Sequence, residues 1–143
     1  MKDRVFIDTN IFVYSFLDNN KNTKEHKKHL EAKKFLQSFY GNYEIIISTQ
    51  VCGEYYSALL KNKILDIDIQ NSLKELIKIV EVSAISESTI LALMELKNRY
   101  KYSYWDSLIL SSALENSCRI LYSEDMQHNQ LIDNQLKIIN PFK

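Results

Sequence analysis

Short apolar runs that alternate with longer stretches of helical periodicity constrain the fold of this sequence more than any other feature. The apolar runs are residues 4–7, 45–47, 79–82, 119–122 and 137–139. The run 45–47 consists of three isoleucines. An unbroken β-branched run of this kind is typical of a strand buried on both faces of a parallel sheet. The alternation therefore predicts an α/β domain with a central, mainly parallel β-sheet flanked by helices.

The stretches between these runs have the spacing of amphipathic helices. Helices are predicted around residues 11–17, 29–40, 51–59, 68–78, 90–96 and 105–116. In the second of these helices, the side chains expected to face the core are Leu30, Phe35, Leu36 and Phe39. Residues 18–28 are polar and rich in lysine, and we expect them to form a loop or an exposed helix start.

The sequence contains only two glycines and one proline among 143 residues. A barrel or sandwich with many tight turns would need more of both, so this scarcity favours long elements and prominent helices. The length fits one compact domain, and we expect residues 1–143 to form it. The segment after Met1 resembles a strand rather than a signal peptide, and no apolar run approaches the roughly 20 residues that span a bilayer. We therefore expect a cytoplasmic protein without a membrane partner.

The formal net charge is +0 and the isoelectric point is about 6.8. A dedicated nucleic-acid binder is usually strongly basic, so a phosphate-rich substrate would have to be held by a local patch or by bound metal ions. Cys52 and Cys118 belong to no Cys-x-x-Cys pair and lie in largely apolar stretches. Both are expected to be reduced cysteines of the core.

Acidic residues follow the predicted strands at positions that favour a common site. Asp8 ends the first strand, and Asp125 comes shortly after the strand 119–122. Glu54 lies in the second turn of the helix that Ser48 is expected to cap, near the same edge of the sheet. Ligands bind in the crevice outside the carboxyl ends of parallel strands. These side chains are therefore expected to meet.

Asp106 lies on the apolar stripe of its own helix. Ile109, Leu110, Ala113 and Leu114 follow it at the spacing of one helical face. A carboxylate directed toward a core is unfavourable unless it is paired or binds a metal, although an acidic residue in a first helical turn can also serve the helix dipole. Several carboxylates in one crevice repel one another unless cations neutralise them, and hard oxygen ligands suit Mg²⁺ or Mn²⁺.

The sequence around each of these four acidic residues resembles a motif of the PIN-domain ribonucleases, the family that includes VapC-type toxins. The motifs are Phe-Ile-Asp-Thr-Asn (6–10), Ser-Thr-Gln-Val-Cys-Gly-Glu-Tyr (48–55), Tyr-Trp-Asp-Ser-Leu-Ile (104–109) and Ser-Glu-Asp-Met (123–126). They occur in the family's order and span essentially the whole chain. The resemblance implies a single PIN-like domain.

The resemblance also implies a metal-dependent endoribonuclease in which water activated by Mg²⁺ or Mn²⁺ attacks an RNA phosphodiester and leaves a 5′-phosphate and a 3′-hydroxyl. The catalytic residues and metal ligands carried over are Asp8, Glu54, Asp106 and Asp125. Glu124 adjoins Asp125, and a shift of one residue would exchange their roles. An antitoxin protein and a second copy of the chain are further partners that the family suggests, beside the RNA substrate.

Candidate substrate contacts lie in two places. Thr9 and Asn10 are expected to orient Asp8 or a substrate phosphate. Arg99 and Lys101 alternate with tyrosines ahead of Asp106, and basic groups with aromatic rings can bind phosphates and unpaired bases. The alternative for this second segment is tyrosines packed on the core and basic side chains in water.

The three histidines form no His-Glu-x-x-His motif. His26 and His29 lie in a charged stretch and are expected on a solvated helix face. His128 follows the fourth motif in a polar loop, where it could hold substrate.

Two other functions compete with the nuclease. A phosphatase with Asp8 as its nucleophile normally needs an aspartate two residues later, where this chain has Asn10. A non-catalytic PIN-like module could hold RNA or a protein instead, although the acidic residues that such a module is free to lose are all present.

Overall fold

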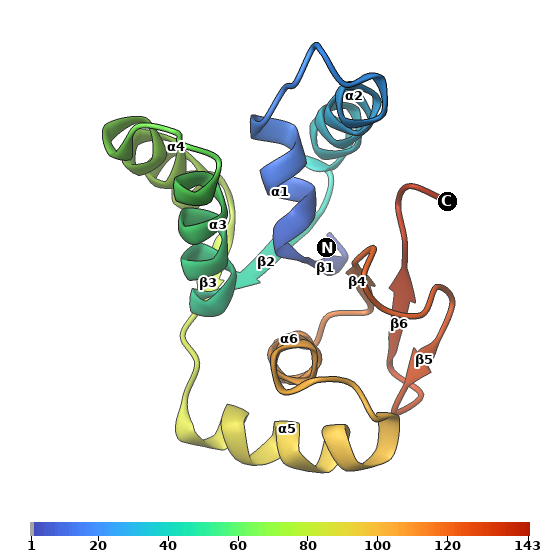
Figure 1. Cartoon of the computed structure of the whole chain (residues 1–143). Coiled ribbons are helices and arrows are strands. Elements are labelled where there is room, and N and C mark those ends of the chain that lie inside the picture. Colours follow the sequence, from blue (N-terminus) through green and yellow to red (C-terminus); the bar gives the residue numbers. More distant parts are fainter. Residues whose placement is uncertain (1) are drawn as a thin grey trace.

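The computed structural model describes residues 2–143, which form six helices and six strands. The strands are β1 (Arg4–Ile7), β2 (Glu44–Ser48), β3 (Glu81–Ser83), β4 (Ile120–Tyr122), β5 (Leu131–Ile132) and β6 (Leu136–Ile139). The helices are α1 (Thr9–Phe16), α2 (Thr23–Phe39), α3 (Thr49–Lys61), α4 (Asp66–Ile79), α5 (Glu87–Tyr100) and α6 (Tyr104–Glu115). All strands belong to one sheet, in the order β3-β2-β1-β4-β6-β5, which crosses the middle of the molecule (Figure 1).

Strand β1 lies at the centre of this sheet. It pairs in parallel with β2 on one side and with β4 on the other, so that Val5 lies opposite both Ile45 and Ile120. Only β5 runs antiparallel, against β6. The last three residues of β1 are fully buried, as expected for a strand covered on both faces. The predicted α/β domain with a mainly parallel sheet is confirmed.

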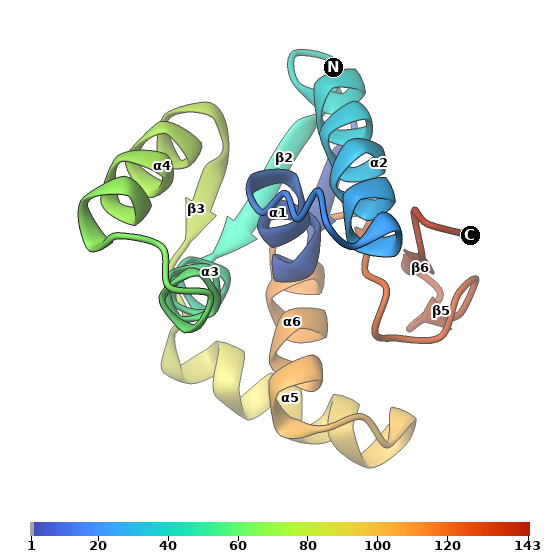
Figure 2. The same cartoon turned by 45° about the horizontal axis from the view of Figure 1, so that its top comes forward.

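Helices cover both faces of the sheet. In Figure 1, α1 and α2 lie above the strands, and α5 and α6 lie below them. The turned view in Figure 2 brings α1 and α2 to the front and leaves α5 behind. Helix α3 packs against α1, α4 and β2 on the β3 side of the molecule. None of the helices within residues 2–143 is long and apolar enough to cross a membrane.

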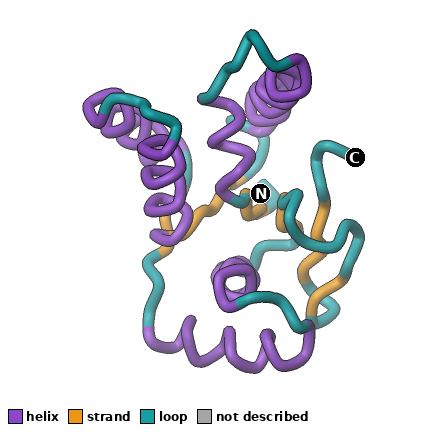
Figure 3. The backbone as a smooth tube through the Cα atoms, in the orientation of Figure 1, coloured by secondary structure: helices purple, strands orange, loops and turns teal. Residues whose placement is uncertain are grey.

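The strand order reverses direction between β1 and β4. The chain runs from β1 outward to β2 and β3, and then returns through α5 and α6 to β4 on the other side of β1. After α6 the described chain continues only as strands and loops (Figure 3). In open parallel sheets, ligands bind at such a reversal, outside the carboxyl ends of the strands. Asp8 follows β1 and the segment 123–125 follows β4, so both lie at this point.

Of the two alternatives expected for residues 18–28, the structure shows an exposed helix start, and it corrects one prediction for the buried face of α2. The helix begins at Thr23, because the side chain of Asn22 accepts hydrogen bonds from the first free amides of the helix, those of Lys24 and Glu25. Leu30 was expected to face the core but is 52% exposed. The buried positions of α2 are His29, Ala32, Leu36 and Phe39, so the predictions for Leu36 and Phe39 are confirmed.

His29 is therefore not on a solvated face, as the sequence suggested. Its side chain is buried, and its Nδ1 lies 2.8 Å from the carbonyl oxygen of Tyr14, which ties α2 to α1. His26 remains partly exposed and lies 2.6 Å from a carboxylate oxygen of Asp18. Strand β5, which has two residues, was not predicted. The helix cap expected at Ser48 is confirmed, and Ser86 caps α5.

The two leucines of α2 give a direct test of this stripe. Leu36→Ala should lower the free energy of unfolding by about 3 kcal/mol, because the side chain is 3% exposed and its removal leaves a cavity. Leu30→Ala, on the same helix, should cost less than about 1 kcal/mol. Urea denaturation of both variants measures the difference. Equal losses would contradict the assignment of the buried face.

Candidate active site

Asp8 follows β1 directly, and hydrogen bonds hold it in place. Its backbone N–H donates to the carbonyl oxygen of Tyr122 at 2.9 Å, which continues the pairing of β1 with β4 by one step. Its carboxylate accepts a hydrogen bond from the backbone N–H of Thr9 at 2.8 Å and another from the hydroxyl of Ser123 at 2.8 Å. Asp8 is thus the N-cap of α1, and the abrupt change from strand to helix fixes the direction of its side chain.

Burial raises the pKa of Asp8 from its ordinary value of 3.8 to about 7. The side chain is only 6% exposed, so water does little to stabilise its ionised form. The hydrogen bonds from Thr9 and Ser123 lower the pKa, whereas the charges of Asp125 and Glu54 raise it. The ionised form of Asp8 therefore lacks a countercharge that a bound cation would supply.

Glu54 projects from the second turn of α3 toward the same point. One carboxylate oxygen accepts a hydrogen bond from the hydroxyl of Thr9 at 2.7 Å. The other accepts one from the side-chain amide of Gln50 at 3.2 Å. The same amide also donates to the backbone carbonyl of Trp105 at 3.1 Å. Gln50 thereby connects α3 to the first turn of α6, where the third acidic residue lies.

Asp106 is the third residue of α6 and lies half-buried next to the cap of that helix. Ser103 is the N-cap, and its hydroxyl accepts the backbone N–H of Asp106 at 3.1 Å. Burial raises the pKa of Asp106, and the charge of Glu54 raises it further. The expected stripe is also present, since Ile109 and Leu110 are buried on the same helix. Asp106 thus lines the same pocket as Glu54 and is close enough for their charges to interact.

Asp125 lies in the loop after β4. Its carboxylate accepts a hydrogen bond from the side-chain amide of Asn10 at 3.0 Å, and its backbone N–H donates to the hydroxyl of Ser123 at 3.3 Å. Partial desolvation raises the pKa of Asp125 even though the residue is exposed, and the charges of Glu124 and Asp106 raise it further. Like Asp8 and Asp106, this carboxyl group is in surroundings that oppose its ionisation.

Glu124 points to a different place from its neighbour. It accepts hydrogen bonds from the hydroxyl of Tyr14 on α1 and from the ammonium group of Lys28 on α2, the latter at 2.7 Å. The hydrogen bond to Glu124 raises the pKa of Lys28. Glu124 therefore belongs to an ion pair that fastens the loop after β4 to two helices, and Asp125 is the one of the two that lines the acidic pocket described next.

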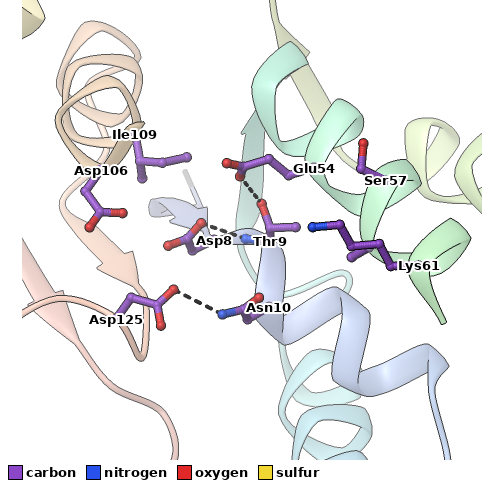
Figure 4. Close-up of a pocket in the computed structure, with 10 residues that line it drawn as sticks. Asp8, Thr9, Asn10, Glu54, Ser57, Lys61, Asp106, Ile109 and Asp125 are labelled. Carbon is purple, nitrogen blue, oxygen red and sulfur yellow. Dashed lines mark hydrogen bonds between the residues drawn. The ribbon is translucent and has the colours of Figure 1, made fainter. Parts of the chain in front are cut away.

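The carboxylates of Asp8, Glu54, Asp106 and Asp125 line one pocket with a volume of about 320 Å³. Its lining residues are Asp8, Thr9, Asn10, Glu54, Ser57, Ala58, Lys61, Asp106, Ile109 and Asp125. In Figure 4 the carboxylates of Asp8, Asp106 and Asp125 gather on one side, while Glu54 and Lys61 reach in from α3. Lys61 is the single basic residue among the described residues that line this acidic pocket.

The donor set fits a hard divalent cation, although it is not drawn together into a ligand group. Within residues 2–143, no three His, Cys, Asp or Glu side chains are close enough to hold a metal ion as they stand. Carboxylate oxygens are nevertheless the ligands that Mg²⁺ and Mn²⁺ prefer. Binding would require the side chains of the acidic pocket to rotate toward one another.

Three residues of the site did not emerge from the sequence. Ser123 and Gln50 are polar neighbours whose contacts depend on the folded arrangement. Lys61 did have a signal, because it follows Glu54 by seven residues, two turns later on the same face of α3, with Ser57 and Ala58 between them. This spacing would have placed a basic group beside the predicted carboxylate.

Other candidate contacts lie outside the acidic pocket. Arg99 donates to both carboxylate oxygens of Asp133, at 3.0 and 2.9 Å. Lys101 is exposed at the end of α5, where it adopts a left-handed conformation with φ of 65°. His128 accepts the backbone N–H of Asn140 at 2.9 Å.

Thr9 and Asn10 do line the pocket, but their side chains hold Glu54 and Asp125 rather than Asp8. Both cysteines are free.

Comparison with known proteins relates the chain to others by sequence and by fold. A sequence model described as the PIN domain matches residues 5–132. No curated protein gives a significant match. Among solved structures, VapC20 from Mycobacterium tuberculosis, described as a toxin that cleaves the sarcin-ricin loop, is 18% identical with a TM-score of 0.65, covering 83% of this chain and 88% of that one.

Two further structures match over nearly their whole length. A toxin-antitoxin complex from Klebsiella pneumoniae is 18% identical with a TM-score of 0.68, covering 96% of this chain and 97% of that one. VapBC2 from Rickettsia felis, solved with a DNA fragment of its promoter, is 21% identical with a TM-score of 0.67, covering 96% and 99%. At these identities, the three matches establish the fold.

Replacing Asp8 by Asn should change how the stability of the metal-free protein depends on pH. The pKa of Asp8 is about 7 in the folded protein and 3.8 when unperturbed, so the folded state binds the proton more tightly. The free energy of unfolding therefore falls as the pH rises through this range, by up to about 1.4 kcal/mol per pKa unit. Asp8→Asn removes this contribution.

Urea denaturation in EDTA measures the effect. Asp8→Asn should be about as stable as the wild type near pH ~4 and more stable near pH ~8. Asp125 and Glu54 interact electrostatically with Asp8, so the difference between the two proteins measures Asp8 together with its effect on these neighbours. The same pH dependence in both would contradict the raised pKa.

Proposed function

The chain belongs to the PIN-domain family, and from this we propose that it is a metal-dependent endoribonuclease that hydrolyses RNA phosphodiester bonds with Mg²⁺ or Mn²⁺. The observation that carries the proposal is the convergence of four carboxylates, from four separate segments of the chain, on one pocket. Charges within this group raise the pKa values of Asp8, Asp106 and Asp125. Such repulsion destabilises a site that has only a structural role, but it favours a site that binds cations.

Asp8, Glu54, Asp106 and Asp125 are the residues that would hold the metal. A bound divalent cation would offset the charge of the phosphodiester and lower the pKa of the attacking water. Hydrogen bonds from neighbouring polar residues keep three of these carboxylates oriented. Thr9 holds Glu54, Asn10 holds Asp125, and Ser123 holds Asp8.

Lys61 is placed to contact the substrate. Its ammonium group extends into the acidic pocket from α3 (Figure 4). Among carboxylates, it is the positive charge that could bind an RNA phosphate. Thr9 and Asn10 lie beside it and can add hydrogen bonds to the same phosphate. Neither Arg99 nor Lys101 lines this pocket, so any contact that they make to RNA would lie outside it.

We further propose that residues 1–143 act in the cytoplasm as the toxin of a toxin–antitoxin pair, with an antitoxin protein as partner and a homodimer as the second expected assembly. The proposal is supported by the fold relatives, one described as a toxin and another as a toxin-antitoxin complex. Induced expression of the wild-type chain should arrest bacterial growth, and expression of Asp8→Asn should not. Equal growth with both would count against a toxin.

The nuclease is tested by comparing two neighbouring acidic residues. Asp125→Asn should reduce RNA cleavage by about 100-fold or more, because it removes a ligand from the acidic pocket. Glu124→Gln should stay within about 10-fold of the wild type, since Glu124 faces Lys28 and Tyr14 instead. The measurement is cleavage of a structured RNA in Mg²⁺ and in Mn²⁺, with the chemistry of the new ends determined.

The expected cleavage disappears in EDTA and leaves 5′-phosphates. Activity that survives EDTA and Asp125→Asn would show that the site is wrongly assigned. Metal binding and a stable fold without cleavage of any RNA would favour the non-catalytic binding module instead.

A further inference from the structure

A second groove, larger than the acidic pocket, opens beside it. Its volume is about 610 Å³, and Glu54 and Ser57 line both spaces. The other residues that line this side groove are Thr49, Gln50, Gly53, Ile85, Ile90, Tyr104, Trp105 and Leu108. They come from α3, from the loop between β3 and α5, from the first turn of α5 and from the first turns of α6. The side groove therefore leads directly away from the carboxylates.

The outer wall of the side groove is aromatic and exposed. Trp105 is 60% exposed and Tyr104 is 38% exposed. The two rings meet edge to face, with their centroids 4.9 Å apart and an interplanar angle of 82°. The side-chain amide of Gln50 donates a hydrogen bond to the backbone carbonyl oxygen of Trp105 at 3.1 Å. An indole that is anchored in this way and left open to water provides a flat surface for another ring.

We propose that the side groove binds one unpaired nucleobase of the RNA, next to the phosphodiester in the acidic pocket, with the base stacked on Trp105. The proposal rests on the proposed nuclease function and adds to it the substrate class, RNA with an unpaired base at the cleavage site. Trp105 directly precedes Asp106, so the stacking surface and the carboxylate are carried by the same helical turn.

The charge of the protein favours a base as the occupant. The net charge is +0, and Lys61 is the single basic residue of the acidic pocket within the described chain. Long-range attraction to phosphates is therefore weak, and binding energy for a flexible strand has to come from uncharged contacts. Stacking of an unpaired base on an aromatic side chain supplies such a contact and is tolerant of sequence.

The position of the side groove also favours RNA over a protein segment. A base is attached to the ribose adjoining the phosphate, so a phosphate held by the acidic pocket brings its own base to the shared edge at Glu54 and Ser57. The apolar walls formed by Ile85, Ile90 and Leu108 can enclose the far edge of that base. A protein segment would need no such connection to the carboxylates.

Trp105 is the only tryptophan in the sequence, so its fluorescence reports on this groove alone. The test uses the full chain carrying Asp8→Asn, which prevents cleavage, titrated with a short unpaired oligoadenylate in Mg²⁺. Stacking should quench the emission of Trp105. An abasic ribose-phosphate oligomer of the same length should leave the emission unchanged, because it offers phosphates without bases.

Variants separate the ring from the rest of the surface. Trp105→Ala in the same background should weaken binding of a labelled oligoadenylate by about 10-fold or more, and Trp105→Phe should recover most of this loss. Leu91→Ala is the matched control, since Leu91 is 58% exposed on α5 but does not line the side groove. It should bind as tightly as the parent protein.

Unchanged Trp105 emission with oligoadenylate overturns the proposal, whether or not the RNA binds elsewhere, and equal quenching by the abasic oligomer overturns it as well. If the side groove binds a protein segment instead, the emission of Trp105 should stay unchanged with oligoadenylate. Failure of the nuclease function is distinguishable, because a wild-type protein that cleaves no RNA while base-dependent quenching persists would leave the base site standing.

Discussion

A carboxylate buried at the end of the central strand is the constraint on which the rest of this structure depends. Asp8 is almost inaccessible to water, and its two hydrogen-bond donors, the Thr9 amide and the Ser123 hydroxyl, carry no net charge. Burial of an ionised group without a countercharge is strongly unfavourable. The negative charges of Asp125 and Glu54 make the ionisation of Asp8 still less favourable. The site therefore carries an electrostatic cost that a bound divalent cation would relieve, and this is the physical basis of the proposed metal site.

Residues 8–10 organise the acidic pocket as a unit. Asp8 supplies the central carboxylate, Thr9 holds Glu54 from α3, and Asn10 holds Asp125 from the loop after β4. Three consecutive residues thus fix three of the four acidic groups, which explains how segments far apart in sequence converge. Outside the pocket, the ion pair of Glu124 with Lys28 fastens the same loop to α2. Neutral hydrogen bonds and an ion pair therefore orient the carboxylates, and none of these contacts needs a metal.

Much of this arrangement was predictable, because parallel strands bring their carboxyl ends to one edge of the sheet. That rule, with the buried stripe around Asp106, was enough to expect four carboxylates together. The direction of individual side chains was not predictable. Whether Glu124 or Asp125 enters the pocket depends on the path of a loop, and Arg99 faces Asp133, which is 34 residues away in the sequence.

The faces of α2 were also misjudged for a tertiary reason. Hydrophobicity alone favours Leu30 at the core, but the helix packs on α1 through the preceding position, where His29 reaches the carbonyl oxygen of Tyr14. A polar residue with a good partner was buried and an apolar one was left exposed. The position of a helix against its neighbours decides such cases, and no local pattern in the sequence records it.

The proposed function depends on the binding of a divalent cation in the acidic pocket. Anomalous diffraction from crystals soaked in Mn²⁺ measures this binding, because the scattering of the metal locates it without reference to activity. We expect an anomalous peak within the pocket lined by Asp8, Glu54, Asp106 and Asp125, and its loss in crystals of Asp8→Asn. An intact fold with no peak there at saturating Mn²⁺, or with the peak only elsewhere, would show that the pocket does not bind the metal.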